Sequence, residues 1–459
     1  MSVAAPAPPS LRVLLALALP MVLARSTQSV IGFCDALMVA PLGSDALAAT
    51  TTGALNTFAA IILPMGTAFI LQSFAAQLLG RGELGAVRRY AWYGIFLAAG
   101  SAVVAAALIP LLGRLLALFH HAPAVHAAMT DYVSIRFLSV GAVVGTEALG
   151  NWYGGLGNTW MQLCAGVVAM VVNVLLCWLL IEGHWGAPAL GVAGSAWAAT
   201  VASWIGFAVV AVPFARGWGG APRAAGRLGL RWSEMARVIR FGLPNGVNWF
   251  LEFSAFLVFI NSIVGHLGTQ TLAAMNVVFQ INSVSFMPAF GMASAGAILA
   301  GQTIGRGRLD DVWPVVKLTL RATMSWQAAM GVVYVAIPAT LIGLFVADVH
   351  TGKVLVEAGT AMLAISGAWQ LFDAIALTFS EALRAAGDTA WCAWARILLA
   401  WAIFTPAAWL WVVDLGGGAV EAAICMVVYL ALLAGLLVWR FRRNAWRSID
   451  LTGIEPHLV

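Results

Sequence analysis

Apolar stretches long enough to cross a bilayer recur along the whole chain, and they limit its fold more than any other feature. A membrane-spanning helix needs about 20 predominantly apolar residues, and twelve such stretches follow one another with short Gly-, Pro- or Arg-containing breaks. Only 9% of the residues are charged, whereas a soluble domain is about a quarter charged. We therefore expect an all-α polytopic membrane protein without a sizeable soluble domain. The predicted spans are 13–38, 47–79, 91–118, 132–155, 160–182, 190–215, 240–264, 271–303, 315–347, 357–385, 391–413 and 420–440.

The basic residues gather in alternate loops between these spans. They cluster after the second span, in the middle loop, after the eighth span and in the C-terminal tail, while the other loops hold almost none beyond Arg114 and Lys353. By the positive-inside rule this pattern predicts cytoplasmic termini and an even number of spans. Because the basic residues sort by membrane side, the net charge of +5 does not indicate nucleic-acid binding.

The two halves of the chain repeat each other at an offset of about 225 residues. The pattern predicts two pseudo-symmetric six-helix bundles, an N-terminal lobe at 1–220 and a C-terminal lobe at 238–459 with a short basic tail, joined by a cytoplasmic linker at 221–237. Two repeats in the same orientation favour a site between the halves and transport by rocking of one against the other. The matched pairs include Pro20 with Pro244, Gly43 with Gly268, Pro64 with Pro288, Gly80-Arg81-Gly82 with Gly305-Arg306-Gly307, and Gly157 with Gly387.

Two acidic residues lie near the predicted middle of the bilayer. Glu252 is about 12 residues, or roughly 18 Å along a helix, from Arg240. Asp373 is about 11 residues, or roughly 17 Å, from Arg384. An ionisable group at this depth is costly and is by default a candidate for function. Two carboxyl groups in a low-dielectric cavity cannot both stay ionised cheaply, so they can exchange a proton, bind sodium or hold an organic cation.

These acids break the repeat. Glu252 is matched by Gln28 and Asp373 by Val143, and a third acid, Asp35 in the first span, is matched by Ile260 or its neighbour. Acids added to a symmetric scaffold indicate site chemistry, although an acid near a helix end, such as Asp35, can also simply face headgroups or water.

Other polar and aromatic residues are weaker candidates. Asn173, Thr200 and Gln280 are supporting polar residues of the spans, and Trp249, Phe253 and Trp369 flank the two central acids, where aromatic faces can hold organic cations. Interhelical hydrogen bonding and helix packing account equally well for these residues. Arg25 and Glu147 also fall inside spans, and the sequence leaves open whether they form an ion pair with each other or with an aspartate.

The chain resembles the multidrug and toxic compound extrusion (MATE) family, most closely its NorM-type bacterial branch, over essentially its whole length. The stretches that carry the resemblance are LALPMVLARSTQSVIGFCDALMVAPLG, AAQLLGRGEL, LGVAGSAWAAT, RFGLPNGVNWFLEF, AGQTIGRGRL and WQLFDAIALTFSEALRAAGDT. The resemblance implies twelve helices in two lobes around a cleft. It also implies export of hydrophobic or cationic drugs against sodium or proton influx, by a multi-pass protein of the bacterial inner membrane.

The resemblance also implies roles for individual residues. It assigns cation coupling to Glu252 and Asp373, with a corresponding first-lobe set of Asp35, Asn173 and Thr200. Two positions depart from the family pattern: Cys177 stands where a second Asp or Asn is usual, and Trp369 where tyrosine is frequent. Both departures remove an oxygen ligand, so they favour protons over sodium at Glu252 and Asp373.

Other functions are less well supported. A lipid-linked oligosaccharide flippase of the same superfamily should carry a cationic central cavity, whereas the cavity candidates here are acids, with Arg25 the exception. No GxSxG, HExxH or Cys/His spacing is present, so neither an enzyme nor a structural metal is indicated. We expect no cofactor, no nucleic-acid partner, a monomer surrounded by membrane lipid, and small organic cations as substrates.

Overall fold

The protein is built almost entirely of helices, as predicted, in a computed structural model that describes residues 10–118, 122–219, 229–345 and 353–453. In this part of the chain ten helices are long and apolar enough to cross a membrane, and α6 with α7, bent by 45°, meet the same criteria as a pair. The 25-residue helix α12 (Val312–Ala336) is as long as these spans but more polar, since it carries Lys317 and Arg321. With it, the helices correspond to the twelve predicted spans.

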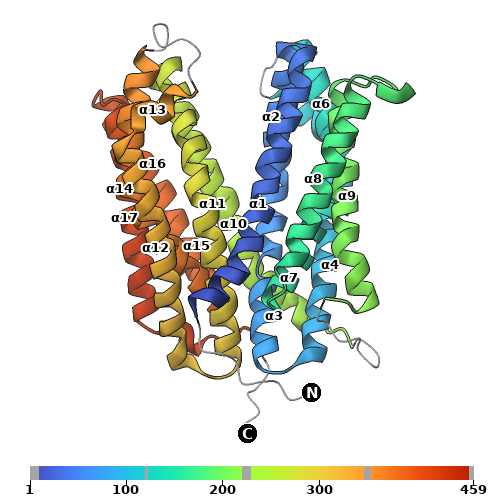
Figure 1. Cartoon of the computed structure of the whole chain (residues 1–459), viewed down its shortest axis with the longest axis vertical. Coiled ribbons are helices and arrows are strands. Elements are labelled where there is room, and N and C mark those ends of the chain that lie inside the picture. Colours follow the sequence, from blue (N-terminus) through green and yellow to red (C-terminus); the bar gives the residue numbers. More distant parts are fainter. Residues whose placement is uncertain (1–9, 119–121, 220–228, 346–352, 454–459) are drawn as a thin grey trace. The chain divides into compact units, whose positions relative to one another are not determined.

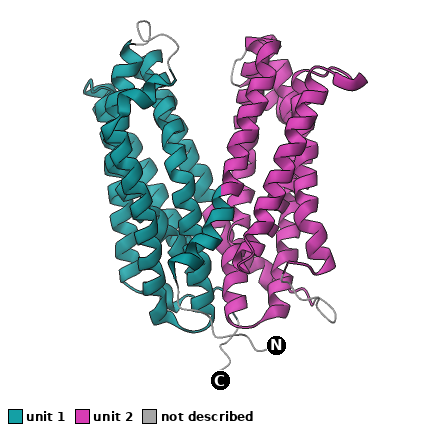
Figure 2. Ribbon diagram, in the orientation of Figure 1, with its two compact units in different colours: residues 1–22, 247–459 teal, residues 23–246 magenta. Residues whose placement is uncertain are grey.

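The chain divides into two compact units (Figures 1 and 2). Unit 1 comprises 1–22 and 247–459, and unit 2 comprises 23–246. Each boundary falls two residues after a proline of the repeat, Pro20 in α1 (Leu11–Val39) or Pro244 in α10 (Trp232–Val258). The first turns of α1 therefore belong to unit 1, and the first turns of α10 to unit 2.

The remaining helices of unit 2 are η1 (Ala40–Leu42), α2 (Ser44–Ala68), α3 (Leu71–Gly80), α4 (Leu84–Leu108), η2 (Ile109–Leu111), α5 (Leu112–Ala117), α6 (Pro123–Phe137), α7 (Val140–Gly155), α8 (Trp160–Ile181), η3 (His184–Gly186) and α9 (Val192–Arg216). Those of unit 1 are η4 (Phe259–Val264), η5 (Gly265–Leu267), α11 (Thr269–Gly305), η6 (Leu309–Asp311), α12, α13 (Pro338–Gly343), α14 (Lys353–Ala386), α15 (Thr389–Leu398), η7 (Leu399–Phe404), α16 (Thr405–Trp409), η8 (Leu410–Asp414), α17 (Ala419–Arg442) and η9 (Ala445–Ser448). The segments η4, η7 and η8 are π-helical.

The backbone supports the repeat found in the sequence. Gly43, after η1, has φ 107° and ψ 172°, and its counterpart Gly268, after η5, has φ 99° and ψ 163°. Gly82 and Gly307 have φ of 77° and 75°. Positive φ is strained for residues with a Cβ, so both halves keep glycine where their helices turn in the same way.

Several helices begin earlier than predicted. Helix α4 begins at Leu84 rather than 91, α6 at Pro123 rather than 132, and α10 at Trp232 rather than 240. Polar residues at the start of a span do not end a helix when its backbone hydrogen bonds continue, so hydropathy alone places these ends too late. The predicted linker at 221–237 therefore overlaps α10, and its residues 221–228 lie outside the described residues.

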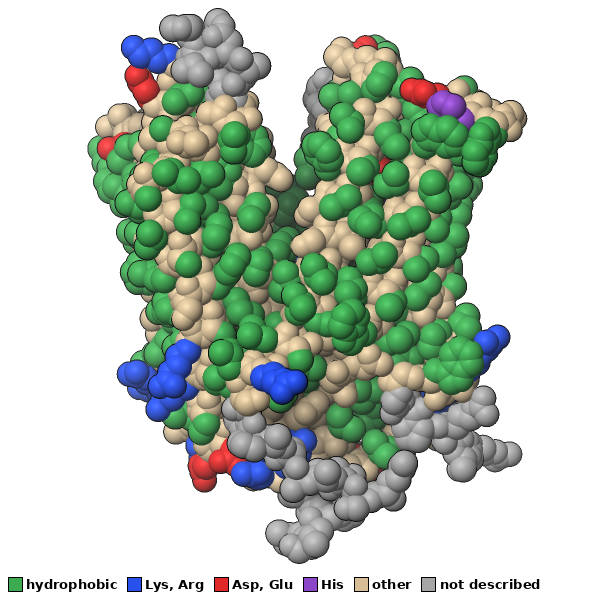
Figure 3. Space-filling view, in the orientation of Figure 1, with side chains coloured by type: hydrophobic (Ala, Val, Ile, Leu, Met, Phe, Trp, Pro, Cys, Tyr) green, Lys and Arg blue, Asp and Glu red, His purple; other side chains and the backbone are tan. Residues whose placement is uncertain are grey.

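Small residues bring neighbouring helices close together within each unit. In unit 1, Gly331 of α12 faces Gly367 of α14, and a Cβ built on Gly331 would lie 2.8 Å from the Gly367 carbonyl oxygen. In unit 2, a Cβ on Gly155 of α7 would lie 2.5 Å from the Gln72 carbonyl oxygen of α3. Such contacts are typical of helices that pack in a membrane. On the face seen in Figure 3, apolar side chains cover the flanks of the helices, as expected for lipid-facing surfaces.

Candidate functional site

Glu252 forms an ion pair inside unit 1 with an arginine that the sequence analysis did not single out. Arg396 of α15 places its Nη1 atom 3.1 and 3.0 Å from the two carboxylate oxygens of Glu252. The Tyr429 hydroxyl of α17 donates to Oε1 of the same carboxylate over 3.0 Å. The side chains of Arg396 and Glu252 are 13% and 19% exposed. Helices α10, α15 and α17 are thus joined through one carboxylate.

Asp373 has a different set of partners. Its Oδ2 atom accepts a hydrogen bond of 2.9 Å from Nε2 of Gln327, a fully buried residue of α12. Arg396 and Glu252 both lie within electrostatic range of the Asp373 carboxyl group. We call Glu252, Asp373, Arg396, Gln327 and Tyr429 the unit-1 cluster. It contains two carboxyl groups and one guanidinium, so with both acids ionised it carries one negative charge that it does not itself balance.

The segment around Arg396 is held against Glu252 by a second contact. The indole of Trp401, in η7, donates to the carbonyl oxygen of Leu251 over 3.0 Å. Helix η7 begins three residues after Arg396 and has π-helical hydrogen bonding, a feature frequent at functional sites because it turns side chains away from their α-helical positions.

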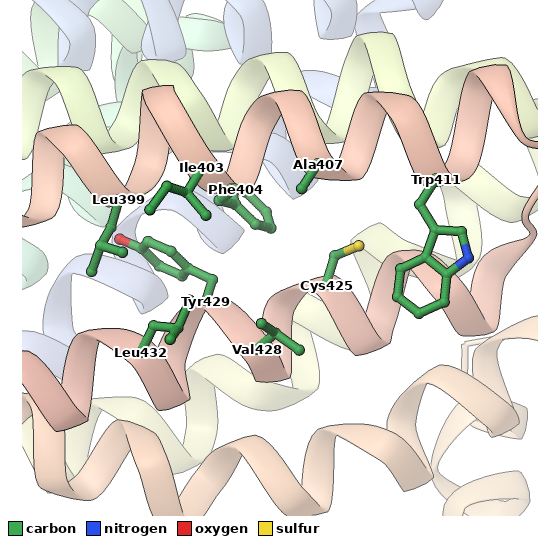
Figure 4. Close-up of a pocket in the computed structure, with 9 residues that line it drawn as sticks. All are labelled: Leu399, Ile403, Phe404, Ala407, Trp411, Cys425, Val428, Tyr429 and Leu432. Atoms are coloured by element: carbon green, nitrogen blue, oxygen red, sulfur yellow. The ribbon is translucent and has the colours of Figure 1, made fainter.

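An apolar cavity of about 230 Å³ lies beside Tyr429. Figure 4 shows it between the segment from Leu399 to Trp411 and helix α17, with Phe404 and Cys425 among its lining residues. The ring centroids of Phe404 and Tyr429 are 5.0 Å apart. Tyr429 therefore presents its ring to the apolar cavity and its hydroxyl to the carboxylate of Glu252.

A polar network between α11 and α14 occupies the part of unit 1 where the sequence predicts cavity aromatics. Trp369 is buried and donates its indole N–H to Asn282 Oδ1 over 3.2 Å. The side-chain amide of Gln370 also donates to Asn282 Oδ1, and its Oε1 atom accepts a hydrogen bond of 3.0 Å from the Ser285 hydroxyl. The indole N–H of Trp369 is therefore engaged within the core rather than at an acid.

The remaining predicted site residues of unit 1 are Gln280 on α11 and the aromatics Trp249 and Phe253 on α10. Gln280 is exposed on α11, and its backbone carbonyl accepts from Ser283 over 2.7 Å. Trp249 and Phe253 lie on α10, three residues before Glu252 and one residue after it, and both are partly buried. Their participation in a substrate cavity stays a prediction.

Asp35 is buried in unit 2 and contacts the residue that departs from the family pattern. Its Oδ1 atom lies 3.2 Å from Sγ of Cys177, and Asn173 lies one turn before Cys177 on α8 and is fully buried. Arg136 of α6 is within electrostatic range of Asp35. Thr200 donates instead to the carbonyl oxygen of Ile135 over 3.1 Å.

Arg25 and Glu147 form a mutual, two-pronged ion pair in unit 2, with N–O distances of 2.9 and 3.1 Å. Asn151 donates to the same carboxylate over 3.1 Å. Because both charged groups are engaged with each other, this pair links α1 to α7 and is not a free cation for an anionic ligand.

The described residues contain no group of three or more His, Cys, Asp and Glu side chains that could hold a metal ion. The oxygens suited to a hard cation in the unit-1 cluster include those of Asp373, Glu252 and the side-chain amide of Gln327. Those of Glu252 already accept hydrogen bonds from Arg396 and Tyr429, whereas Oε1 of Gln327 is buried without a partner in the described part of the chain.

Comparison with known proteins identifies related sequences. The MatE family model matches residues 20–179 and 244–410, which correspond to the two halves of the repeat. A probable multidrug resistance protein NorM from Rhizobium meliloti is 29% identical over 445 residues, covering 95% of this chain and 94% of that protein. One of the same description from Burkholderia pseudomallei is 27% identical over 432 residues, covering 94% and 92%.

Solved structures share the fold. An outward-facing multidrug resistance MATE family transporter of the MOP superfamily matches with a TM-score of 0.85 at 17% identity, covering 95% of this chain and 97% of that one. The eukaryotic MATE transporter AtDTX14 matches with a TM-score of 0.83, also at 17% identity, covering 95% and 96%. The predicted MATE-like fold of twelve helices is thereby confirmed.

Proposed function

Because the chain belongs to the MatE family of multidrug efflux transporters, we propose that it exports amphipathic organic cations in exchange for protons, with Asp373 as the coupling carboxylate. The observation that carries this proposal is the unequal pairing of the two acids in unit 1. Glu252 is paired with Arg396, whereas Asp373 is held by the neutral amide of Gln327.

The chemistry follows from the charge of the cluster. With Asp373 ionised, its negative charge attracts a cation into an apolar protein interior, and binding of a proton removes that attraction. A proton and an organic cation that compete for one carboxyl group exclude each other. Each therefore drives release of the other when the site is exposed to opposite sides of the membrane in turn, which is the basis of antiport.

The substrate class follows from the surroundings of the cluster. Phe404 and Tyr429 border an apolar cavity, and in this proposal that cavity accepts the apolar body of a ligand whose positive charge is attracted to Asp373. Aromatic faces stabilise organic cations by about 0.5–2 kcal/mol each. A large amphipathic monocation fits these requirements better than a small inorganic ion.

The proposal also covers the location, topology and assembly of the protein. We place the protein in the bacterial inner membrane with both termini in the cytoplasm, following the asymmetry of basic residues between loops. We treat residues 1–220 and 238–459 as its two lobes and the monomer as its working unit. In this account Asp35, with Asn173 and Cys177, forms a second polar site in unit 2.

The experiment is efflux of ethidium from proteoliposomes under an imposed proton or sodium gradient. We expect a proton gradient to drive efflux by the wild type, and D373N to abolish it while the protein still inserts. If D373N keeps wild-type efflux and D35N loses it, the coupling site belongs to unit 2. If neither gradient drives efflux by the wild type, multidrug antiport fails and flipping of a lipid-linked oligosaccharide becomes the hypothesis to test.

A further inference from the structure

We propose that Arg396 is a built-in counter-ion that occupies the cation position of Glu252 and excludes sodium from that carboxylate. This inference rests on the proposed function, because it concerns which ion the transporter uses. The evidence for it is the geometry around Glu252.

The contacts of Glu252 leave little room for a sodium ion. One guanidinium nitrogen of Arg396 lies 3.1 Å from Oε1 and 3.0 Å from Oε2, and Tyr429 adds a third hydrogen bond of 3.0 Å to Oε1. Hard cations bind through several oxygen ligands, and here the two carboxylate oxygens face a positive charge. Sodium can enter only by displacing that charge.

Displacement of Arg396 is unfavourable. Its guanidinium stays protonated at any physiological pH, so deprotonation cannot open the site. Its side chain is 13% exposed, and its Nε atom is already buried without a hydrogen-bond partner in the described part of the chain. Removing Glu252 would take from this buried guanidinium the carboxylate that contacts it directly, which destabilises a protein interior.

The matched positions of the other half of the internal repeat carry neither the arginine nor the glutamate. Counting from the matched Pro20 and Pro244, the counterpart of Glu252 is Gln28; counting from the matched Gly157 and Gly387, the counterpart of Arg396 is Gly166. A Cβ on Gly166 would lie 2.7 Å from Oγ1 of Thr27. The unit-2 scaffold thus closes the space that an arginine would need, and it lacks both members of the ion pair.

Asp373 is the carboxyl group of this cluster that is not paired with Arg396. The charged and titratable groups that interact with it in the described part of the chain are Arg396 from α15, Glu252 from α10 and Tyr429 from α17. Helix α12 supplies the neutral Gln327. Arg396 balances one of the two carboxylates. The other can bind a proton or an organic cation without any change in the Glu252 pair.

The test is binding of ²²Na⁺ to purified protein, with every variant made on a D35N background so that unit 2 does not contribute. We expect R396K, which keeps the positive charge, to bind sodium no more tightly than the D35N parent. We expect R396M, which leaves Glu252 unpaired, to bind sodium at least about tenfold more tightly than the parent, a difference of about 1.4 kcal/mol. Adding E252Q to R396M should abolish that binding.

A second readout addresses variants that fold poorly. Sodium should raise the unfolding temperature of R396M relative to choline, since a ligand stabilises the state that binds it, and should leave R396K unchanged. The inference is overturned if the parent binds sodium and E252Q removes this binding, or if folded R396M binds no more sodium than the parent. Because these measurements need no transport, they remain informative even if the wild type moves no organic cation.

Discussion

Replacement of Glu252 by glutamine should destabilise the protein through the arginine that it leaves behind. The amide keeps nearly the same shape, but it removes the negative charge opposite Arg396. A loss of transport in E252Q would then have two causes, a missing carboxylate and a disturbed fold, and these must be separated before the variant says anything about coupling.

The structure gives the size of the expected effect. Removing one partner of a buried ion pair costs about 3–5 kcal/mol. The two side chains here retain 13% and 19% exposure, and a glutamine carbonyl still accepts one hydrogen bond, so we expect a loss at or below the lower limit of this range, about 2–3 kcal/mol. The double variant E252Q/R396M removes both charges and should recover most of this loss, because buried ion pairs are replaceable by neutral groups.

The assay is equilibrium unfolding in mixed detergent micelles, monitored by tryptophan fluorescence. The matched control is E357Q, also in unit 1, which breaks a pair with Lys353 of 3.9 Å whose side chains are 67% and 79% exposed and should change stability little. The reasoning is refuted if E252Q is as stable as the wild type, or if E252Q/R396M is less stable than E252Q.

Three other substitutions test the packing of each unit. G155A should lower the stability of unit 2 by about 1–3 kcal/mol through overpacking, since its Cβ would lie 2.5 Å from the Gln72 carbonyl oxygen; G85A, with nothing within 4 Å, is the control, and thermal unfolding in detergent compares them. G268A should cost about 1–3 kcal/mol through its backbone conformation alone, with φ 99° and ψ 163°, because nothing lies within 4 Å of its Cβ; unchanged denaturant unfolding would contradict this. W446A should cost about 3–5 kcal/mol, because Trp446 is 3% exposed, and a wild-type unfolding midpoint would contradict this burial.

Much of the fold could be predicted from the sequence because its strongest signals are local. Each span is a continuous apolar stretch, and the glycines at 43 and 268 or 82 and 307 recur with the same backbone conformation. Helix starts were less predictable, since the polar first turns of α4 and α10 continue helices that hydropathy assigns to loops. The break after α12, at Pro338, was likewise missed within a single predicted span.

The two central acids could be found from the sequence, but their partners could not. Arg396 lies 144 positions from Glu252 and only a few residues inside a predicted span, where an arginine normally extends to the membrane surface. Gln327 and Tyr429 are unremarkable in apolar helices until the fold brings them to Asp373 and Glu252. The signal that could have revealed Arg396 was the repeat, in which its counterpart is Gly166.

The central claim is that an organic cation and a proton compete for Asp373. It is tested most directly by adding tetraphenylphosphonium to purified protein in weakly buffered detergent solution and measuring proton release. We expect the wild type and D35N to release protons on binding and D373N to release none. Equal release by D373N and the wild type, or binding without release by the wild type, would contradict the account.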